Sequence, residues 1–309
     1  MANIRMKKPF VNTLAGVAAA ALMCGSAQAA PIAADVVFVV DESGSMGGEH
    51  SWLQDMINPL ESGLTGQGVG VSAPNRYALV GYGGSSLGPH FSGHAHDMDP
   101  GAAGQQDWGD DSQFSAATGT LVTDGGTEDG WEALDWAINN LGFRSEAAKN
   151  FVLVTDEDRD NEDGSLTKSG ILNDLASLNA LLNVVVDNSF GCNPDTSGAI
   201  GIDSTETGFE TDGSGGFTTC EGLGQIGSGD GSTETQYVDM ALQSGGAAWD
   251  LNILRDGGDK AASFTQAFVD TKVQEITDQP GGGTPVPEPG TLALLGLGIA
   301  GLGLRRRRG

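Results

Sequence analysis

Apolar runs and helical spacings alternate along the middle of this chain. Residues 36–40 form an unbroken apolar run, which is typical of a strand buried on both faces of a sheet. Three later runs, residues 77–82, 151–155 and 184–186, have the same character. Between and after these runs, apolar residues recur at helical spacing. The helical positions are Trp52, Leu53, Met56 and Ile57; Trp131, Leu134, Ile138 and Leu141; Ile171, Leu172, Leu175 and Leu178; and Phe264, Phe268, Val269, Val273 and Ile276.

This alternation predicts an α/β fold: a doubly wound, mainly parallel sheet with helices on both faces, as in Rossmann-like folds. We expect the domain to span residues 34–277. Residues 118–122 are expected to add an antiparallel edge strand, and residues 241–253 a helix, a glycine pair and the last strand. Two long inserts, at about residues 84–113 and 188–235, interrupt the pattern.

A polar motif directly follows the first predicted strand. Residues 41–46 read Asp-Glu-Ser-Gly-Ser-Met. Residues two apart in an extended chain point the same way, so Asp41, Ser43 and Ser45 can aim one carboxylate and two hydroxyls at one point beyond the sheet edge. Oxygen donors suit a hard divalent cation, Mg²⁺ first. Alternatively, the serines only cap the following helix and Asp41 accepts hydrogen bonds from loop amides.

The D-x-S-G-S spacing closely resembles the metal-ion-dependent adhesion site (MIDAS) of von Willebrand factor A (vWA) domains, the fold shared with integrin I domains. That family completes its site with a threonine from a later loop and an aspartate after the fourth strand, which Thr127 and Asp156 match here. The resemblance implies a bound divalent cation, Mg²⁺ or else Mn²⁺ or Ca²⁺. It also implies that the cation binds an acidic group of an extracellular protein or polysaccharide ligand.

Two departures from the family pattern bring additional carboxylates. Asp129 stands where the family often has a second threonine, and Glu157 and Asp158 follow Asp156 where it often has glycine. We expect such groups to raise cation affinity and to repel acidic ligands. Because parallel strands end at one edge of a sheet, we also expect both long inserts to lie over the cation.

The charge of the chain excludes one class of partner. Its 309 residues carry a formal net charge of -26, and the basic residues concentrate at the two ends. Nucleic-acid binding is disfavoured because no basic patch is available to neutralise phosphates. The acidity also leaves a second function open: a Ca²⁺-loaded structural component of an extracellular polysaccharide or biofilm matrix.

The two ends of the chain read as targeting segments. Residues 1–29 have basic, apolar and small-residue regions in the order of a secretory signal peptide. Residues 278–285 form a Gly/Pro linker. Residues 286–309 contain Val286, Pro287, Glu288 and Pro289, an apolar stretch at 291–304 and four arginines.

This C-terminal tail closely resembles a PEP-CTERM sorting signal, and a plain membrane anchor is the alternative. The resemblance implies processing by an exosortase, transient membrane contact, and delivery to the cell surface or extracellular matrix of a Gram-negative bacterium. In an exported protein, Cys192 and Cys220 are expected to form a disulfide.

Two further motifs are less specific. Residues 84–88 match the G-x-S-x-G pattern of serine hydrolases around Ser86, but no helical pattern follows, so we expect no enzyme activity. A histidine-rich loop contains His90, His94 and His96, together with Asp97 and Asp99. Such a loop can hold Zn²⁺ or another transition metal, but a solvated polar loop is the simpler interpretation.

Overall fold

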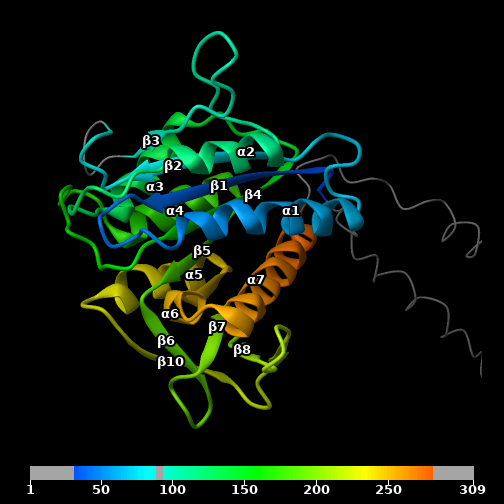
Figure 1. The fold of residues 1–309 in the computed structure, drawn as a ribbon, viewed down its shortest axis with the longest axis vertical. Helices are drawn as coiled ribbons and strands as arrows, with labels where there is room; N and C mark the ends of the chain where they lie inside the picture. The colour runs from blue at the N-terminus through cyan, green and yellow to red at the C-terminus, as the bar shows by residue number, and fades with distance from the viewer. Residues whose placement is uncertain (1–30, 88–92, 281–309) are drawn as a thin grey trace, which may run out of the picture. The chain divides into compact units, whose positions relative to one another are not determined.

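A computed structural model describes residues 31–87 and 93–280, which form one eleven-stranded sheet with helices against both faces (Figure 1). Nine strands follow the order β10-β6-β7-β11-β5-β4-β1-β2-β3, and β8 and β9 continue from β7. The strands are β1 Ala33–Asp41, β2 Arg76–Tyr82, β3 His94–Ala95, β4 Ala147–Val154, β5 Ala180–Val186, β6 Asn188–Cys192, β7 Ala199–Asp203, β8 Gly208–Thr211, β9 Phe217–Thr219, β10 Gly224–Gly229 and β11 Ala247–Asp250.

The centre of the sheet is parallel and doubly wound, as predicted. Strands β2, β1, β4, β5 and β11 lie side by side and run parallel. The chain moves outward from β1 to β2 and β3, then returns to place β4 on the other side of β1. Such a reversal of strand order marks the point where open α/β sheets bind ligands, beyond the carboxyl ends of the strands. Here that point lies between β1 and β4.

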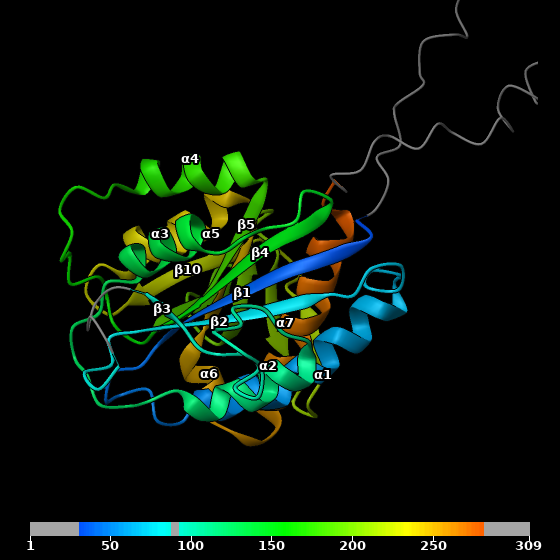
Figure 2. The same cartoon turned by 90° about the horizontal axis from the view of Figure 1, so that it is seen from above.

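The two faces of the sheet bury separate helix layers, as Figure 2 shows. All nine residues of β1 are buried, and alternate side chains enter opposite layers. Phe38 belongs to the core layer of α1, α2 and α7, whereas Val39 belongs to the layer of α3 and α4. The helical segments are α1 His50–Gly66, α2 Asp111–Ala117, the 3₁₀ turn η1 Thr118–Thr120, α3 Gly130–Asn140, α4 Lys168–Leu178, the π-helical turn η2 Glu234–Val238, α5 Asp239–Ser244, α6 Leu251–Arg255 and α7 Gly258–Asp278.

The edge strand expected at residues 118–122 is wrong. Residues Thr118–Thr120 instead form the 3₁₀ turn that continues α2. Thr118 Oγ1 and Thr120 Oγ1 donate to the carbonyls of Ser115 and Ala117, at 2.8 and 2.7 Å, which favours a helical turn over an extended chain. The antiparallel edge strand is β3, where Ala95 pairs with Val80 of β2.

In the residues that the structure describes, both long inserts add pairing at the edges of the sheet, so neither lies wholly over the predicted cation site as expected. The first insert runs back along β2, where Gly109 pairs with Tyr77, and leads into α2, which packs on α1. The second insert forms β6 to β10, and β7 pairs antiparallel with β11. Strands β2 and β11 would otherwise present unpaired N–H and C=O groups, which these additions satisfy.

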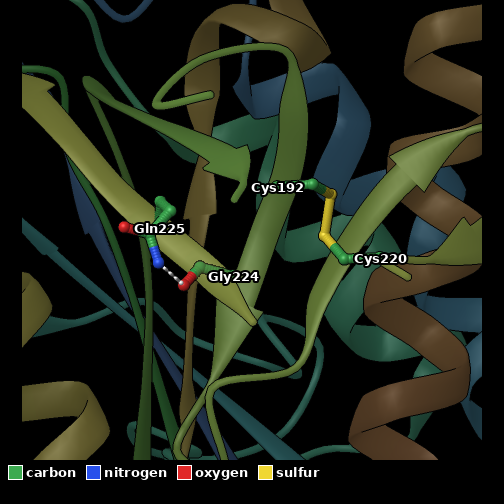
Figure 3. Close-up of a disulfide and its surroundings, with 4 residues drawn as sticks. All are labelled: Cys192, Cys220, Gly224 and Gln225. Carbon is green, nitrogen blue, oxygen red and sulfur yellow. Dashed lines mark hydrogen bonds between the residues drawn. A yellow bond between two sulfur atoms is a disulfide. The ribbon is translucent and has the colours of Figure 1, made fainter. Parts of the chain in front are cut away.

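The expected disulfide ties the second insert together. It joins Cys192, at the end of β6, to Cys220, directly after β9, with a Cα–Cα distance of 5.5 Å (Figure 3). Cys192 also pairs with Gly224 of β10. Three strands of the insert are therefore held together at one corner.

Several predictions concern residues outside the described ranges. They are the signal peptide at 1–29, most of the linker at 278–285, the sorting signal at 286–309 with its apolar stretch, and His90. Among the residues that the structure describes, no helix is long and apolar enough to cross a membrane.

Candidate metal centre

The loop after β1 meets the end of β4 at the point where the strand order reverses. The Ser43 and Ser45 hydroxyl oxygens are 2.9 Å apart, and Ser45 Oγ donates to Asp156 Oδ1 at 2.9 Å. Because Ser45 uses its proton on Asp156, the Ser43 hydroxyl donates to Ser45. A continuous chain of hydrogen bonds therefore links the two strand ends.

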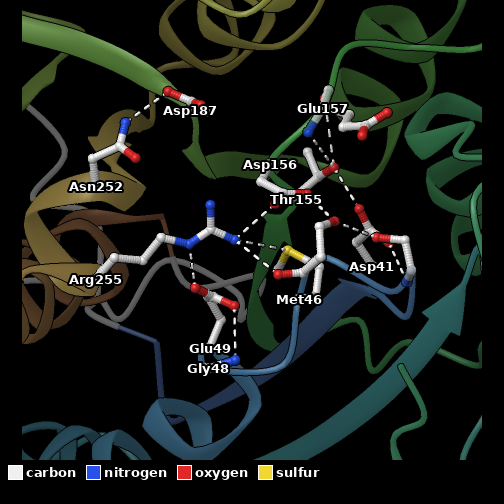
Figure 4. Close-up of polar contacts among 12 residues, drawn as sticks. Asp41, Met46, Gly48, Glu49, Thr155, Asp156, Glu157, Asp187, Asn252 and Arg255 are labelled. Atoms are coloured by element: carbon white, nitrogen blue, oxygen red, sulfur yellow. Dashed lines mark hydrogen bonds and ion pairs between the residues drawn. The ribbon is translucent and has the colours of Figure 1, made fainter. Parts of the chain in front are cut away.

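Asp41, the last residue of β1, is held from both sides. It is fully buried, and its Oδ1 accepts the Ser43 amide at 2.7 Å. Its Oδ2 accepts Thr155 Oγ1, from the residue after β4, at 2.9 Å (Figure 4). Each carboxylate oxygen has a second lone pair that remains available, so the group is oriented without being saturated.

The backbone of Thr127, the remaining predicted ligand, lies near the Asp41 carboxylate. A Cβ built on Gly83 would lie 3.1 Å from Asp41 Oδ1 and 3.6 Å from the Thr127 carbonyl oxygen. Gly83 has a φ of 84°, which favours glycine, and it lets the loop approach closely. Within the described residues, the Thr127 hydroxyl makes no hydrogen bond to the other four predicted ligands.

Glu128 is a component that the sequence analysis missed. The residue is 2% exposed, and one of its carboxylate oxygens lies within 4.8 Å of oxygens from both Asp41 and Asp156. The Glu128 amide donates to Asp160 Oδ2 at 2.8 Å, which fixes the backbone just before α3. Its position next to Thr127 was the available signal, but the family spacing pointed to Asp129.

Asp129 and Asp158, expected to raise cation affinity, make their polar contacts away from this cluster. Asp129 caps α3 through the Trp131 and Glu132 amides, both at 3.2 Å. It also forms a buried ion pair with Arg159 at 2.6 Å. Asp158 accepts the amide and hydroxyl of Ser232, both at 2.8 Å. Asp129 is therefore paired with Arg159, and Asp158 Oδ2 is held by Ser232.

The remaining acids lie close together in a largely buried site. Burial raises the pKa of Asp41 above its usual range, against hydrogen bonds from Ser43 and Thr155, and the charge of Asp156 raises it further. Burial also raises the pKa of Glu128, and the charges of Asp41 and Glu157 act in the same direction. A cation that binds among neighbouring carboxyl groups stabilises their ionised forms, which burial and mutual repulsion disfavour.

Arg255 supplies a positive charge at the margin of the site. It ends α6, and its Nη2 donates to Asp156 Oδ2 at 2.7 Å and to the Ser45 carbonyl at 3.3 Å (Figure 4). Its Nε pairs with Glu49 Oε1. Burial would lower the pKa of Arg255, but these two carboxylates raise it, so the guanidinium stays charged.

This donor set fits a hard divalent cation. Carboxylate and hydroxyl oxygens converge here from Asp41, Ser43, Ser45, Glu128 and Asp156. All of these candidate ligand atoms are oxygens. Mg²⁺, Mn²⁺ and Ca²⁺ prefer such oxygen ligands.

The G-x-S-x-G segment does not form a nucleophile elbow in the described residues. The amides of Ser85 and Ser86 donate to Asp124 Oδ1, at 2.8 and 3.2 Å. Where the described chain resumes, at Gly93, it enters strand β3 and not a helix. A nucleophile elbow requires strand, sharp turn and helix in direct succession.

Comparison with known proteins gave two kinds of match. Residues 285–308 match the PEP-CTERM protein-sorting motif. No curated protein matches the chain. Among solved structures, similar chains include proximal thread matrix protein 1 from the mussel byssus, with 13% identity over 50% of this chain and a TM-score of 0.34. A von Willebrand factor type A protein from Catenulispora acidiphila has 17% identity over 50% of this chain and a TM-score of 0.32.

A third similar structure is the vWF domain of the type V pili tip protein Mfa5 from Porphyromonas gingivalis, with 23% identity over 42% of this chain and a TM-score of 0.30. The matches cover 36%, 33% and 40% of these three chains, respectively, which is well under two thirds of each. The chain thus carries a PEP-CTERM sorting motif at its C-terminal end, and its structural neighbours include von Willebrand factor A domains.

Proposed function

We propose that this protein is a non-enzymatic binding protein of the cell surface that holds a divalent cation at the carboxyl ends of β1 and β4. The observation that carries the proposal is the hydrogen-bonded chain from Ser43 through Ser45 to Asp156, with Asp41 and Glu128 beside it. The proposed ligands are Asp41, Ser43, Ser45, Thr127 and Asp156, with Glu128 added. Thr127 is included from the family resemblance.

Bound among these residues, Mg²⁺ would supply an electrophilic centre for an acidic group of a ligand. The chain's own residues prepare the site for this role. Ser45 is exposed, so the approach is from solvent, while Asp41 and Ser43 are buried behind it. Arg255 adds a fixed positive charge next to Asp156, which favours an incoming carboxylate.

The sorting motif supports a location for this activity. A PEP-CTERM signal implies processing by an exosortase, so we propose export through the N-terminal signal segment followed by delivery to the surface or matrix of the producing cell. The partner would be an extracellular protein or polysaccharide that carries acidic groups.

The proposal is tested in two steps. Calorimetry with Mg²⁺ compares the wild-type protein with Asp156→Asn and Asp41→Ala, and Ser214→Ala, in an exposed turn, serves as the control. We expect both aspartate variants to lose Mg²⁺ binding, with circular dichroism confirming that each is folded. Unchanged Mg²⁺ affinity in both folded variants would remove the site from consideration.

The second step addresses the partner. The protein is used to capture material from the extracellular fraction of the producing cell, with Mg²⁺ or with EDTA. Capture that needs Mg²⁺ and fails with Asp156→Asn supports a discrete ligand. Retention by bulk polysaccharide that is indifferent to Asp156→Asn supports instead the acidic matrix component, which the net charge of -26 favours.

A further inference from the structure

A second cluster of metal-ligating side chains lies on the opposite side of the β1 loop. Glu42 follows Asp41, and its amide extends the β1–β2 pairing by donating to the Tyr82 carbonyl at 2.7 Å. Its carboxylate meets His94 and His96 of the β3 segment. One oxygen of Glu42 and one nitrogen of each histidine lie within 4.8 Å of one another.

The backbone brings both histidines to the same side. His94 pairs with Gly81 of β2, and the His96 amide donates to the Leu79 carbonyl at 2.9 Å, so the segment is extended across both residues. Residues two apart on an extended chain project the same way. The histidine-rich loop is therefore not simply a solvated loop at these two positions.

The donor atoms are buried and close together, yet they do not satisfy one another. His94 Nε2 lies 3.1 Å from Glu42 Oε2, and His96 Nε2 lies 3.3 Å from Glu42 Oε1. Among the described residues, however, His94 Nε2, His96 Nε2 and Glu42 Oε2 have no partner with hydrogen-bond geometry. The Glu42 side chain is 0% exposed and that of His96 is 4% exposed, so these unsatisfied atoms are shielded from bulk solvent.

The hydrogen bonds around His96 fix its protonation pattern. Thr120 Oγ1 donates to the Ala117 carbonyl at 2.7 Å, so toward His96 Nδ1, at 2.6 Å, it can only accept. A proton of His96 therefore lies on Nδ1, and Nε2, which faces the Glu42 carboxylate, is the ring atom that can bind a cation. A dication bound there would satisfy the carboxylate and the ring nitrogen together in this buried place.

The spacing fits a transition metal. Ligands about 2.1 Å from a tetrahedral Zn²⁺ lie about 3.4 Å from one another, close to the two separations above. The strand also leaves room, because a Cβ on Gly81 would collide with Glu42 Oε2 and His96 Nε2. Two imidazoles and a carboxylate select Zn²⁺ and related ions over Mg²⁺, which prefers oxygen.

We propose that Glu42, His94 and His96 form a second metal site, which binds Zn²⁺ or a similar transition-metal dication. Three protein ligands leave one coordination position for water or an external ligand. Thr120 is a positioning residue that orients His96. The metal would bridge the β3 edge segment and the loop after β1. This site does not depend on the proposed function, since it shares no side chain with the Asp41 cluster.

The test is a Zn²⁺ titration of chelator-treated protein in excess Mg²⁺, in which calorimetry measures binding. A parallel titration with Co²⁺ in place of Zn²⁺ measures the absorption of the bound Co²⁺. We expect one equivalent of Zn²⁺ that Mg²⁺ does not displace. His94→Ala and His96→Ala should each weaken binding by more than about 100-fold, and Thr120→Val by about 10- to 100-fold, as for other outer-shell partners. His94, whose side chain is 22% exposed, is the substitution least disruptive to folding.

Two controls keep the result specific. His50→Gln changes an imidazole that hydrogen-bonds to the Asp41 carbonyl, and it should leave Zn²⁺ affinity unchanged. Asp156→Asn should remove Mg²⁺ binding and retain Zn²⁺ binding, so the two sites can fail separately. The proposal is overturned if folded wild-type protein binds no stoichiometric Zn²⁺. Equal Zn²⁺ affinity in wild type, His94→Ala and His96→Ala would overturn it as well.

Discussion

Replacing Glu128 with glutamine should change stability in opposite directions with and without a divalent cation. In the metal-free protein, the Glu128 carboxylate lies no more than 4.8 Å from carboxylates of Asp41 and Asp156. In Glu128→Gln this repulsion disappears, so the chelated protein becomes more stable. In excess Mg²⁺ the variant loses a ligand, so its gain in stability from the cation becomes smaller.

The size of the effect follows from Coulomb's law. Two unit charges 4.8 Å apart repel by about 3.5 kcal/mol in an effective dielectric of about 20. Partial protonation of Asp41 and Glu128, together with water at the exposed Ser45, reduces this to about 1–2 kcal/mol. For a domain of this size, that corresponds to a rise in melting temperature of roughly 2–8 °C in EDTA.

Differential scanning calorimetry of wild type and Glu128→Gln, each in EDTA and in Mg²⁺, measures both halves of this prediction. Glu221→Gln makes the same chemical change at an exposed position and should shift neither melting temperature. If Glu128→Gln lowers the melting temperature in EDTA while leaving the response to Mg²⁺ intact, Glu128 is not part of a repulsive cation site.

Three further outcomes are expected. Arg255→Gln should raise Mg²⁺ affinity about fivefold in calorimetry, because a partly exposed ion pair worth about 1 kcal/mol no longer competes for Asp156. Equal or weaker Mg²⁺ affinity in the variant would contradict this. In EDTA, the free energy of unfolding should fall as pH rises from about 4 to about 7, since folded Asp41 keeps a proton that the unfolded chain releases; urea titrations showing a rise would refute it. Cys192→Ser/Cys220→Ser should lose up to about 3.5 kcal/mol for a loop with a sequence separation of 28, and an unchanged urea midpoint would exclude that contribution.

The central strands and the helix layers were predictable because their signals are local. Residues 36–40 and 151–154 are buried on both faces, and a run without polar alternation records this directly in the sequence. The inserts gave no comparable signal. Strands β6 to β10 are short, and most of them contain glycine. They become strands through distant pairing: β7 pairs with β11, and the others pair with β7 or with one another.

The details of the candidate sites depend on contacts that are distant in sequence. Whether Glu128 or Asp129 faces the cluster is decided by where α3 begins, because the N-cap position turns Asp129 toward the helix amides. Arg255 reaches Asp156 from a five-residue helix that no local pattern marked. His94 and His96 form a site only because β3 pairs with β2 next to Glu42.

The register of strand β1 sets the positions of both candidate metal centres. It pairs with β2 from Asp35 to Asp41 and with β4 from Ala33 to Val40. Its last residue, Asp41, and the next residue, Glu42, face opposite directions. A one-residue insertion or deletion inside this strand would turn each following side chain of the strand to the opposite face of the sheet. Both centres would then be lost in one event, so natural variants of this protein should accumulate length changes in the inserts and none within β1.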